Sequence, residues 1–577
     1  MHKNSYGLRV WTWFEKHAFY VFVFLALLVT FYGYFYPLLK NPYDASNPWP
    51  DAYQVIQKEI ISQQKVPPDY VIQFGEKQPS DMTYFLNHHL MMVEMKLTDG
   101  LPFDINERFV SAFFTFLIFL SAYLCFTKIF GNKSGFWASM LFLFLPRNLN
   151  YYVNVNGEFF SFLLLFVSLY FLFDWIQERN RKSLVVGIII AAIMPILCLI
   201  NFGTFCIVIF SYGMMQFLYS KQKPDVVMEY LKLFGLIVAA SFIISGIPLI
   251  ITGNLFVGES SSIGSLYSQR DQKEVKFEKK YYEDYATYGR TLYGYPALVR
   301  DLYYMSLDGS QINYLFVYFV FPALLGALLI INKKTRSREL VFSLCLAVVL
   351  LALEVFLYSR LFNDNIYNSA LRFLLYFGLP MAFIGGIALD YLRRHWAYLG
   401  LIFLISISVS GFFMIKYSAH SGNLYLALYA KSYKQALAWV KDNTLPDDKL
   451  ISNEWTGGQF WVQADRLDLV ESGKASAAYS TYTKIYSNLD AARKIFSLDV
   501  PSEETAALIN QYDIKYIVIW NRPASYLLYP FEASKRKLDQ LPYVERVFDA
   551  TSLSDDSYRA EAAVYRVKTS QLPQWVK

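Results

Sequence analysis

Charged residues and cysteines are both scarce in this sequence. Charged side chains make up 17% of the 577 residues, whereas an ordinary soluble domain carries about 25%. This scarcity excludes an intrinsically disordered protein, a coiled coil and an ordinary cytosolic enzyme. The four cysteines all lie in apolar runs and show no Cys-x-x-Cys spacing, so neither a disulfide framework nor a structural zinc site is expected.

A basic cluster on a polar segment is also missing. The net charge is +6, but the excess lies in short loops between apolar runs, so nucleic acid is not an expected partner. Hydrophobic residues make up 55% and aromatic residues 18% of the chain, which is typical of a protein in lipid and at its interfaces. The lipid bilayer is therefore the expected surroundings.

Long apolar runs occur throughout the first 415 residues. A helix needs about 20 mostly apolar residues to cross a bilayer, because its backbone polar groups must be bonded within the segment. The first run is too long for a cleaved signal peptide, and no small-residue cleavage site follows it. We expect eleven membrane-spanning helices, at residues 18–39, 108–130, 134–147, 157–176, 183–200, 202–219, 231–252, 313–332, 339–358, 370–390 and 396–415.

Lysine and arginine are concentrated in every second loop between these spans. Short loops rich in these residues stay in the cytoplasm, so the alternation predicts a cytoplasmic amino terminus and an extracytoplasmic carboxyl terminus. The predicted class is a polytopic, multi-pass α-helical protein of the cell membrane. The basic residues of the loops predicted to be cytoplasmic are Lys3, Arg9, Lys16, Lys128, Lys133, Arg179, Arg181, Lys182, Lys221, Lys223, Lys333, Lys334, Arg336, Arg338, Arg393 and Arg394.

Most of the unusual polar sequence falls on the side predicted to be extracytoplasmic. It comprises a loop at about residues 40–107, a hairpin at about residues 146–157, a loop at about residues 253–312, and a tail that begins at about residue 416. The composition changes sharply at the tail. We therefore expect a transmembrane domain over residues 1–415 and a soluble extracytoplasmic α/β domain over residues 416–577, which is a normal domain size.

Hydrophobic spacing in the tail predicts both helices and strands. Residues 432–443 are expected to form an amphipathic helix. Two short apolar runs, residues 450–451 and 516–520, are expected to be buried strands. A further helix is expected over residues 501–512, with Ser502 as its N-cap. These elements together define the predicted α/β domain.

Two carboxylates lie at the predicted outer membrane boundary. Asp51 follows Pro50 at the start of a short helix with one apolar side, and Glu158 follows Asn156 where a helix re-enters the membrane. Carboxylate and amide oxygens are suitable ligands for Mg²⁺ or Mn²⁺. Alternatively, each acid only stabilises the first turn of its helix through the helix dipole. For Asp51 the sequence supports both interpretations equally.

Further polar side chains lie at the same boundary. Arg372 is at the outer start of the tenth span, where a guanidinium either binds an anion such as a lipid-linked phosphate or reaches the headgroups by snorkelling. His88 and His89 are candidates for contact with a phosphate or sugar, although interfacial hydrogen bonding is the commoner role of such residues. The polar segment at 267–296 is either a lid over the external site or a solvated surface helix.

Taken together, these positions resemble the GT-C superfamily of membrane glycosyltransferases, and within it the catalytic subunit of oligosaccharyltransferase. Asp51 stands where that family has its first-loop acidic motif, and Arg147 followed by Asn156-Gly157-Glu158 resembles the second-loop motif. Arg372-Phe373 resembles the start of the late span whose arginine meets the donor phosphate. The run from Ser452 to Trp461 resembles the start of the family's external domain.

The resemblance implies a GT-C-like fold and an enzyme. Its implied reaction is the metal-assisted, inverting transfer of a sugar or glycan from a polyprenyl-(di)phosphate-linked donor to a protein or glycolipid acceptor on the extracytoplasmic face. The implied site consists of Asp51 and Glu158 as catalytic residues, Arg372 and Arg147 on the donor phosphate, Asp51, Asn156 and Glu158 around Mn²⁺ or Mg²⁺, and His88, His89 and Trp455 as candidate substrate contacts.

The sequence departs from the family at three places. The family's Trp-Trp-Asp-Tyr-Gly acceptor motif is absent, because this chain has Glu-Trp-Thr-Gly-Gly at residues 454–458. Asn156 stands at the first acid of the second-loop pair. The family's glutamate in the long late loop has three candidate counterparts here, Glu259, Glu278 and Glu283.

Two other classes of protein are alternatives. A transporter or flippase of lipid-linked or polysaccharide substrates places ionisable groups near the bilayer midplane, and Glu354 is the clearest acid within a span of this sequence. A non-catalytic membrane scaffold with an external binding domain leaves the shared boundary position of Asp51, Glu158 and Arg372 to coincidence. The polar residues at the outer boundary favour the enzyme.

Overall fold

The structure is a computed structural model of the whole chain. It describes residues 5–40, 69–71, 77–79, 103–144, 157–247, 324, 326, 328, 337–359, 378–396, 398–400, 402–406, 408–409, 431–453, 464, 466–468, 491–521, 530–553 and 559–572.

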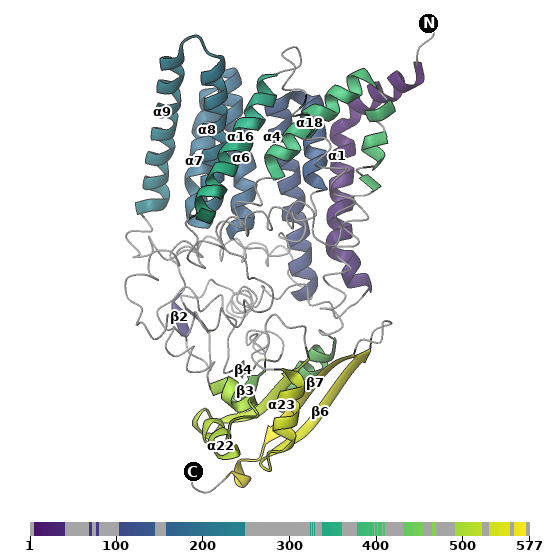
Figure 1. Ribbon diagram of the computed structural model, residues 1–577, viewed down its shortest axis with the longest axis vertical. Coiled ribbons are helices and arrows are strands. Elements are labelled where there is room, and N and C mark those ends of the chain that lie inside the picture. Colours follow the sequence, from purple (N-terminus) through teal and green to yellow (C-terminus); the bar gives the residue numbers. More distant parts are fainter. Residues whose placement is uncertain are drawn as a thin grey trace. The chain divides into compact units, whose positions relative to one another are not determined.

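The chain forms two compact units. The first, which we call the helical unit, comprises residues 1–34 and 103–417, and the second, the sheet unit, comprises residues 35–102 and 418–577. Figure 1 shows long helices in the first unit and a sheet with short helices in the second.

The helical unit consists of long, apolar helices. In the described part of the chain, five segments are long and apolar enough to cross a membrane: Lys16–Gly33, Ala112–Leu143, Phe160–Glu178, Ile200–Tyr219 and Lys223–Gly246. The protein is thus a helical membrane protein, as predicted, and the total of eleven spans stays a prediction. The helices are α1 (Ser5–Lys40), α4 (Phe103–Leu143), α6 (Gly157–Glu178), α7 (Arg181–Leu197), α8 (Leu199–Tyr219), α9 (Lys223–Ser241) with the π-helical turn η1 (Phe242–Gly246), α16 (Arg338–Ser359) and α18 (Gly378–His395).

Helix α4 reverses direction at Gly131. This residue has φ 76° and ψ 164°, a backbone conformation that essentially only glycine adopts. The ring centroids of Phe119 and Phe142 are 6.1 Å apart, although an uninterrupted helix would separate these residues by about 34 Å. Helix α4 is therefore a hairpin, and its arms, residues 103–130 and 132–143, correspond to the second and third predicted spans.

Helices α7 and α8 are separated by one extended residue. Cys198 has φ −162° and ψ 112°, and Pro195 lies within the last turn of α7. Proline has no N–H to donate to the carbonyl four residues earlier, and its ring crowds that carbonyl, so Pro195 weakens the end of α7. The predicted spans 183–200 and 202–219 place this break at residue 201, which is wrong, because Asn201 is helical in α8.

The ends of two other helices differ from the sequence prediction. Helix α9 begins at Lys223 rather than at residue 231, because Pro224 and Asp225 form a good first turn that hydropathy does not register. Helix α18 runs to His395, beyond the predicted end at residue 390, because the charges of Arg393 and Arg394 are paired within the last turn. In contrast, α16 matches the predicted span 339–358 to within one residue at each end.

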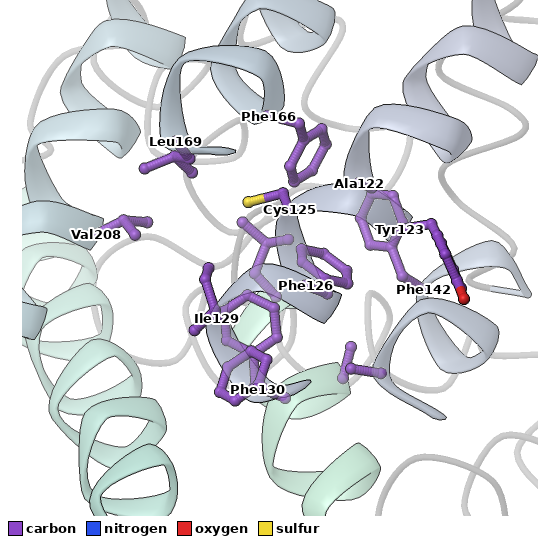
Figure 2. Close-up of a cluster of buried hydrophobic side chains, with 14 of the residues drawn as sticks. Ala122, Tyr123, Cys125, Phe126, Ile129, Phe130, Phe142, Phe166, Leu169 and Val208 are labelled. Carbon is purple, nitrogen blue, oxygen red and sulfur yellow. The ribbon is translucent and has the colours of Figure 1, made fainter. Parts of the chain in front are cut away.

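Phenylalanine rings form the centre of the helical unit. Phe126 lies edge-on to Phe142, Phe166 and Phe383, with ring centroids 5.5, 5.6 and 4.8 Å away. Figure 2 shows this cluster around Cys125, which is fully buried. Edge-to-face contacts between aromatic rings favour fixed orientations. The rings therefore hold both arms of α4 against α6 and α18.

The sheet unit contains a five-stranded mixed sheet in the order β4-β3-β5-β7-β6. Strand β3 pairs in parallel with β4 and β5, whereas β7 pairs antiparallel with β5 and β6. A separate antiparallel pair joins β1 and β2. The bounds are β1 (Asp69–Val71), β2 (Lys77–Pro79), β3 (Lys449–Ser452), β4 (Leu467–Asp468), β5 (Ile514–Trp520), β6 (Val544–Leu553) and β7 (Arg559–Val567).

Both faces of the sheet are covered, which explains the apolar strand sequences. Alternate residues of β5 face opposite cores: Ile517 lies with α22 (Ser502–Gln511) and α23 (Phe531–Asp539), and Val518 lies with the helix at 431–443. The predicted helix at 432–443 and the strands at 450–451 and 516–520 are therefore confirmed. The predicted N-cap is wrong, because Pro501 caps α22 and Ser502 is its first helical residue.

Candidate functional site

The described charges of the helical unit gather at one end of its helices. Lys128 contacts Asp174 at 2.6 Å and also Glu178, and Arg179 pairs with Glu229 at the start of α9. These contacts join the hairpin turn of α4, the end of α6 and the start of α9. We call this the charged end, and it contains the basic loops predicted to be cytoplasmic at 128–133, 179–182, 221–223 and 393–394.

Asp390 on α18 is the most buried acid at the charged end. It is 2% exposed and accepts hydrogen bonds from Arg393 at 3.0 Å and Arg394 at 2.5 Å. Ser134, just after the hairpin turn of α4, donates to the same carboxylate at 3.1 Å. A buried carboxylate needs such partners, since an unpaired charge there is very costly. Asp390 therefore ties α18 to the second arm of α4.

This carboxylate is not among the site residues predicted from the sequence, in which residue 390 is the end of a span and the two arginines belong to a cytoplasmic loop. The available signal was the spacing itself, because an acid followed by arginines three and four residues later is the pattern of ion pairs on one helix face.

The second arm of α4 and α18 run antiparallel and in register. Ser134 meets Asp390 near the charged end, and one turn further Gly386 packs directly on Ala138. Continuing this register brings the end of the second arm, at Leu143, beside the first turn of α18, which begins at Gly378. Both helix termini thus lie at the end of the helical unit that is opposite the charged end.

The start of α6 lies at the same opposite end. The rings of Phe142 and Phe162 are stacked with centroids 6.3 Å apart, so the last turn of α4 and the first turns of α6 are neighbours. Three helix termini therefore converge: the end of α4, the start of α6 and the start of α18. The segments that carry Arg147, Asn156 and Arg372 connect to these termini in the chain.

The predicted site residues themselves fall mostly outside the described residues. Glu158 is the second residue of α6, a position where the helix dipole favours a carboxylate, but its side chain is not among those described. Glu354 is a residue of α16, and its side chain is likewise not among those described. The residues outside the described part are Asp51, His88, His89, Arg147, Asn156, Arg372 and Trp455, together with the three candidate glutamates and the predicted lid.

The described residues form no metal centre of their own. In the parts of the chain that the structure describes, no group of three or more histidine, cysteine, aspartate or glutamate side chains is arranged to hold a metal ion. The predicted ligands Asp51 and Asn156 lie outside those parts. A divalent cation at the converging helix termini therefore stays a prediction.

Known structures resemble the fold over almost the whole chain. The Archaeoglobus fulgidus oligosaccharyltransferase tethered with an acceptor peptide is 12% identical, with a TM-score of 0.52 over 98% of this chain and 75% of that chain. ArnT from Cupriavidus metallidurans bound to undecaprenyl phosphate is 13% identical, with a TM-score of 0.56 over 96% of this chain and 99% of that chain. The same oligosaccharyltransferase in complex with Zn and sulfate is 13% identical, with a TM-score of 0.50 over 96% and 74% of the two chains.

These proteins are GT-C membrane glycosyltransferases, and this chain has a GT-C-like fold. At such low identity the similarity concerns the fold. No protein-family model and no curated protein sequence matches the chain.

Proposed function

We propose that the protein is a GT-C membrane glycosyltransferase. It transfers a sugar or glycan from a polyprenyl-(di)phosphate-linked donor to a protein or glycolipid acceptor on the extracytoplasmic face of the cell membrane. The observation that carries this proposal is the similarity of fold over 96–98% of the chain to two such enzymes. One of these structures holds undecaprenyl phosphate and another an acceptor peptide; the first is the lipid phosphate part of such a donor, and the second is an acceptor.

The converging helix termini support the proposed site. The segments with Arg147 and Arg372 connect to neighbouring helix ends, and Glu158 begins α6 at the same place. In our proposal the two guanidiniums bind the donor phosphate, since their planar donor groups match phosphate oxygens. The donor reaches them laterally from the lipid.

The proposed cation ligands have suitable chemistry for a hard metal ion. Asp51, Asn156 and Glu158 offer only oxygen atoms, and such ligands favour Mg²⁺ or Mn²⁺ over softer metals. A cation held there supplies stabilisation of the negative charge that develops on the departing phosphate. The amide at residue 156 contributes no charge, so the site relies on its two carboxylates.

The carboxylates also fit the needs of an inverting displacement. The acceptor nucleophile attacks from the side opposite the leaving phosphate, and a base there must accept its proton. In our proposal Asp51 and Glu158 either hold the cation or activate the acceptor nucleophile, and each of these tasks needs a carboxylate. His88, His89 and Trp455 are candidate contacts for the sugar or the acceptor.

Asp51→Ala tests the proposal most directly. We expect it to reduce transfer by at least about 100-fold, the usual contribution of a positioned acid or base, while the protein remains folded. Asp44→Ala is the matched control, because it removes another acid from the same loop. The assay uses purified full-length protein, a panel of polyprenyl-linked sugars, and reactions with and without Mn²⁺.

Two results would contradict the proposal. The first is turnover close to wild type in Asp51→Ala, which removes the assigned catalytic role. The second is absence of transfer from every donor of the panel by the wild-type protein, combined with movement of a labelled polyprenyl-linked donor across vesicles. That result would favour a flippase.

A further inference from the structure

The second arm of α4 is enclosed by protein. Residues 135–144 are all buried, so this arm presents no side to lipid along those residues. Such enclosure is unusual for a helix of a membrane protein, where most helices expose an apolar face. The arm therefore takes its position entirely from its neighbours.

Two glycines allow this close packing. A Cβ atom at Gly135 would lie 2.5 Å from the Cα atom of Thr127 on the first arm. A Cβ atom at Gly386 of α18 would lie 2.5 Å from the backbone nitrogen of Ala138. Both contacts are against backbone, which cannot yield as a side chain can. The arm is thus held between the first arm and α18 with no space for an additional methyl group.

A polar contact fixes the same arm along its axis. Ser134 donates to Asp390 at 3.1 Å, and Asp390 is itself held by Arg393 and Arg394. Gly386 and Asp390 are one turn apart on α18 and meet Ala138 and Ser134, one turn apart on the arm. The two contacts together prevent α18 from sliding or turning relative to α4.

The geometry points to a positioning role for this joint: Gly386 and the Ser134–Asp390 contact set the place of the Arg372 segment relative to the segments with Arg147 and Glu158. This inference rests on the proposed function, in which those arginines bind the donor phosphate. Arg372 lies six residues before α18, and Arg147 lies four residues after α4. Because these distances along the chain are short, we expect a displacement of α18 relative to α4 to change the relative position of the two arginine segments.

Gly386→Ala is the main test. The new methyl group must push α18 away from the backbone of Ala138. A misplacement of about 1 Å at an active site can lower the reaction rate by about 100-fold, and we expect phosphate binding to be similarly sensitive. We expect the dissociation constant for polyprenyl phosphate to rise about 10- to 100-fold. The matched control is Gly235→Ala on α9, where a Cβ atom meets nothing within 4 Å and the helix propensity changes equally.

A second pair of variants, with smaller structural changes, keeps the test valid if Gly386→Ala does not fold. Ser134→Ala removes the hydroxyl contact to Asp390 and leaves the arginine pairs in place. Its control is Ser183→Ala, which removes a similar hydroxyl contact to Asp174, 2.6 Å long and also at the charged end. We expect Ser134→Ala to raise the dissociation constant about fivefold, the equivalent of one ordinary hydrogen bond, and Ser183→Ala to leave it unchanged.

The measurement is a binding titration of full-length protein in detergent with polyprenyl phosphate. It gives both a dissociation constant and the number of sites, and these separate two effects. Loss of folded protein lowers the number of sites, whereas misplacement of the phosphate-binding residues raises the dissociation constant. Arg372→Ala is measured in parallel as the reference for direct loss of a phosphate contact.

The outcomes distinguish the two proposals. If the wild type does not bind polyprenyl phosphate, or if Arg372→Ala binds it as the wild type does, the proposed site is wrong. If Arg372→Ala weakens binding while Gly386→Ala and Ser134→Ala retain the wild-type dissociation constant, the positioning role is wrong and the proposed function stands. Equal effects of Ser134→Ala and Ser183→Ala also contradict the positioning role.

Discussion

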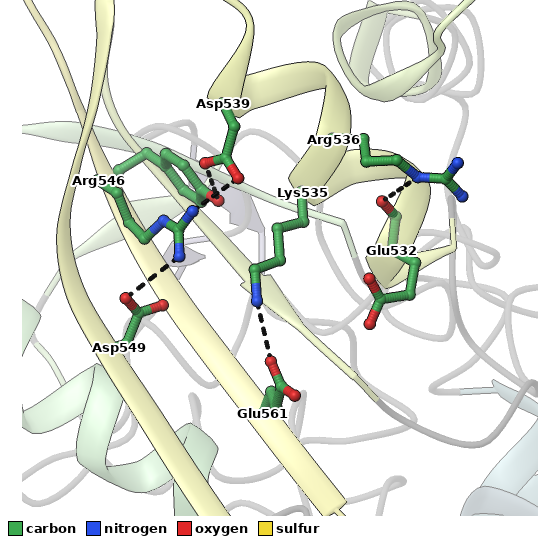
Figure 3. A network of polar contacts seen from close by, with 8 residues as sticks. Glu532, Lys535, Arg536, Asp539, Arg546, Asp549 and Glu561 are labelled. Carbon is green, nitrogen blue, oxygen red and sulfur yellow. Dashed lines mark hydrogen bonds and ion pairs between the residues drawn. The ribbon is translucent and has the colours of Figure 1, made fainter.

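Ionic contacts are arranged differently in the two units. In the helical unit the described ion pairs gather at the charged end, and at Asp390 the pair is buried, with side chains 3% and 8% exposed. In the sheet unit the pairs are distributed over the surface, as between Arg546 and Asp539 at 2.6 Å, and Figure 3 shows several of them on α23, β6 and β7. In lipid a charge must be paired or lie at a helix end, whereas in water a surface pair contributes little.

The hydrophobic cores of the two units also differ. The helical unit packs large rings such as Phe126 and Phe383 against one another and uses glycines where backbones approach. The sheet unit packs isoleucine and valine from alternating strand positions on two faces. Water drives the burial of strand residues, but lipid does not drive helices together, so close contact and polar pairs must do so. The following substitutions test this difference.

Asp390→Ala is expected to have the largest effect. It removes the acid that pairs with the buried Arg393, and breaking a buried pair in this way costs about 3–5 kcal/mol. Asp225→Ala, an exposed acid in the first turn of α9, should cost at most about 1 kcal/mol. Thermal unfolding in detergent measures both. Equal melting temperatures of the two variants would show that buried pairing does not distinguish the charged end from an ordinary surface.

Asn453→Ala should have an intermediate effect on the sheet unit. The buried side chain of Asn453 accepts from the backbone N–H of Trp520 at 2.8 Å and donates to its carbonyl at 3.1 Å. Its loss leaves two buried backbone groups without these bonds, which costs about 1–3 kcal/mol. Asn443→Ala, which removes an exposed contact within one helix, is the control, with a change within about 0.5 kcal/mol.

Hydrogen exchange of the β5 amides in the full-length protein measures this effect. Exchange should become faster in Asn453→Ala and remain as in the wild type in Asn443→Ala. Unchanged protection in Asn453→Ala would show that the two strand ends are held together without the amide.

Glu545 should show the smallest effect, visible only as a dependence on pH. The hydrogen bond from Arg566, and then the charge of Lys568, hold the pKa of Glu545 below its ordinary value of 4.5. A carboxylate whose pKa is lower in the folded state stabilises the fold above the unfolded pKa, and this stabilisation is lost as the pH falls through the folded pKa. Between about pH 6 and pH 3, the wild-type sheet unit should therefore lose more stability than Glu545→Gln. Parallel losses in thermal unfolding would contradict the pairing.

Much of the architecture could be predicted from the sequence, because lipid requires long apolar helices and a covered sheet requires apolar strands. The ends of the helices were less predictable, because spans were located by their apolar runs and a polar first or last turn lies outside such a run. Helix α9 therefore begins earlier than predicted, and Pro195 rather than Asn201 determines the break before α8. The burial of Asp390 was not predictable either, because its partner Ser134 is distant in the chain.

For the candidate site, the sequence indicated which segments contribute to it but not how their side chains are arranged. Short motifs around Arg147, Glu158 and Arg372 suggested a shared place, and the described helix termini next to these segments do converge. The roles of the side chains stay predictions, because the distances among them depend on residues outside the described part of the chain. Sequence spacing carries no information on such distances when the segments are far apart in the chain.

The hairpin at Gly131 also constrains how the protein is made. The second arm of α4 has 12 residues, from 132 to 143, and extends about 18 Å, which is less than the hydrocarbon thickness of about 30 Å. An arm this short cannot enter the bilayer as an independent segment. Its longer partner must therefore bring it into the bilayer, and the side of the arm that carries Ser134 and Ala138 is covered only after the much later synthesis of α18.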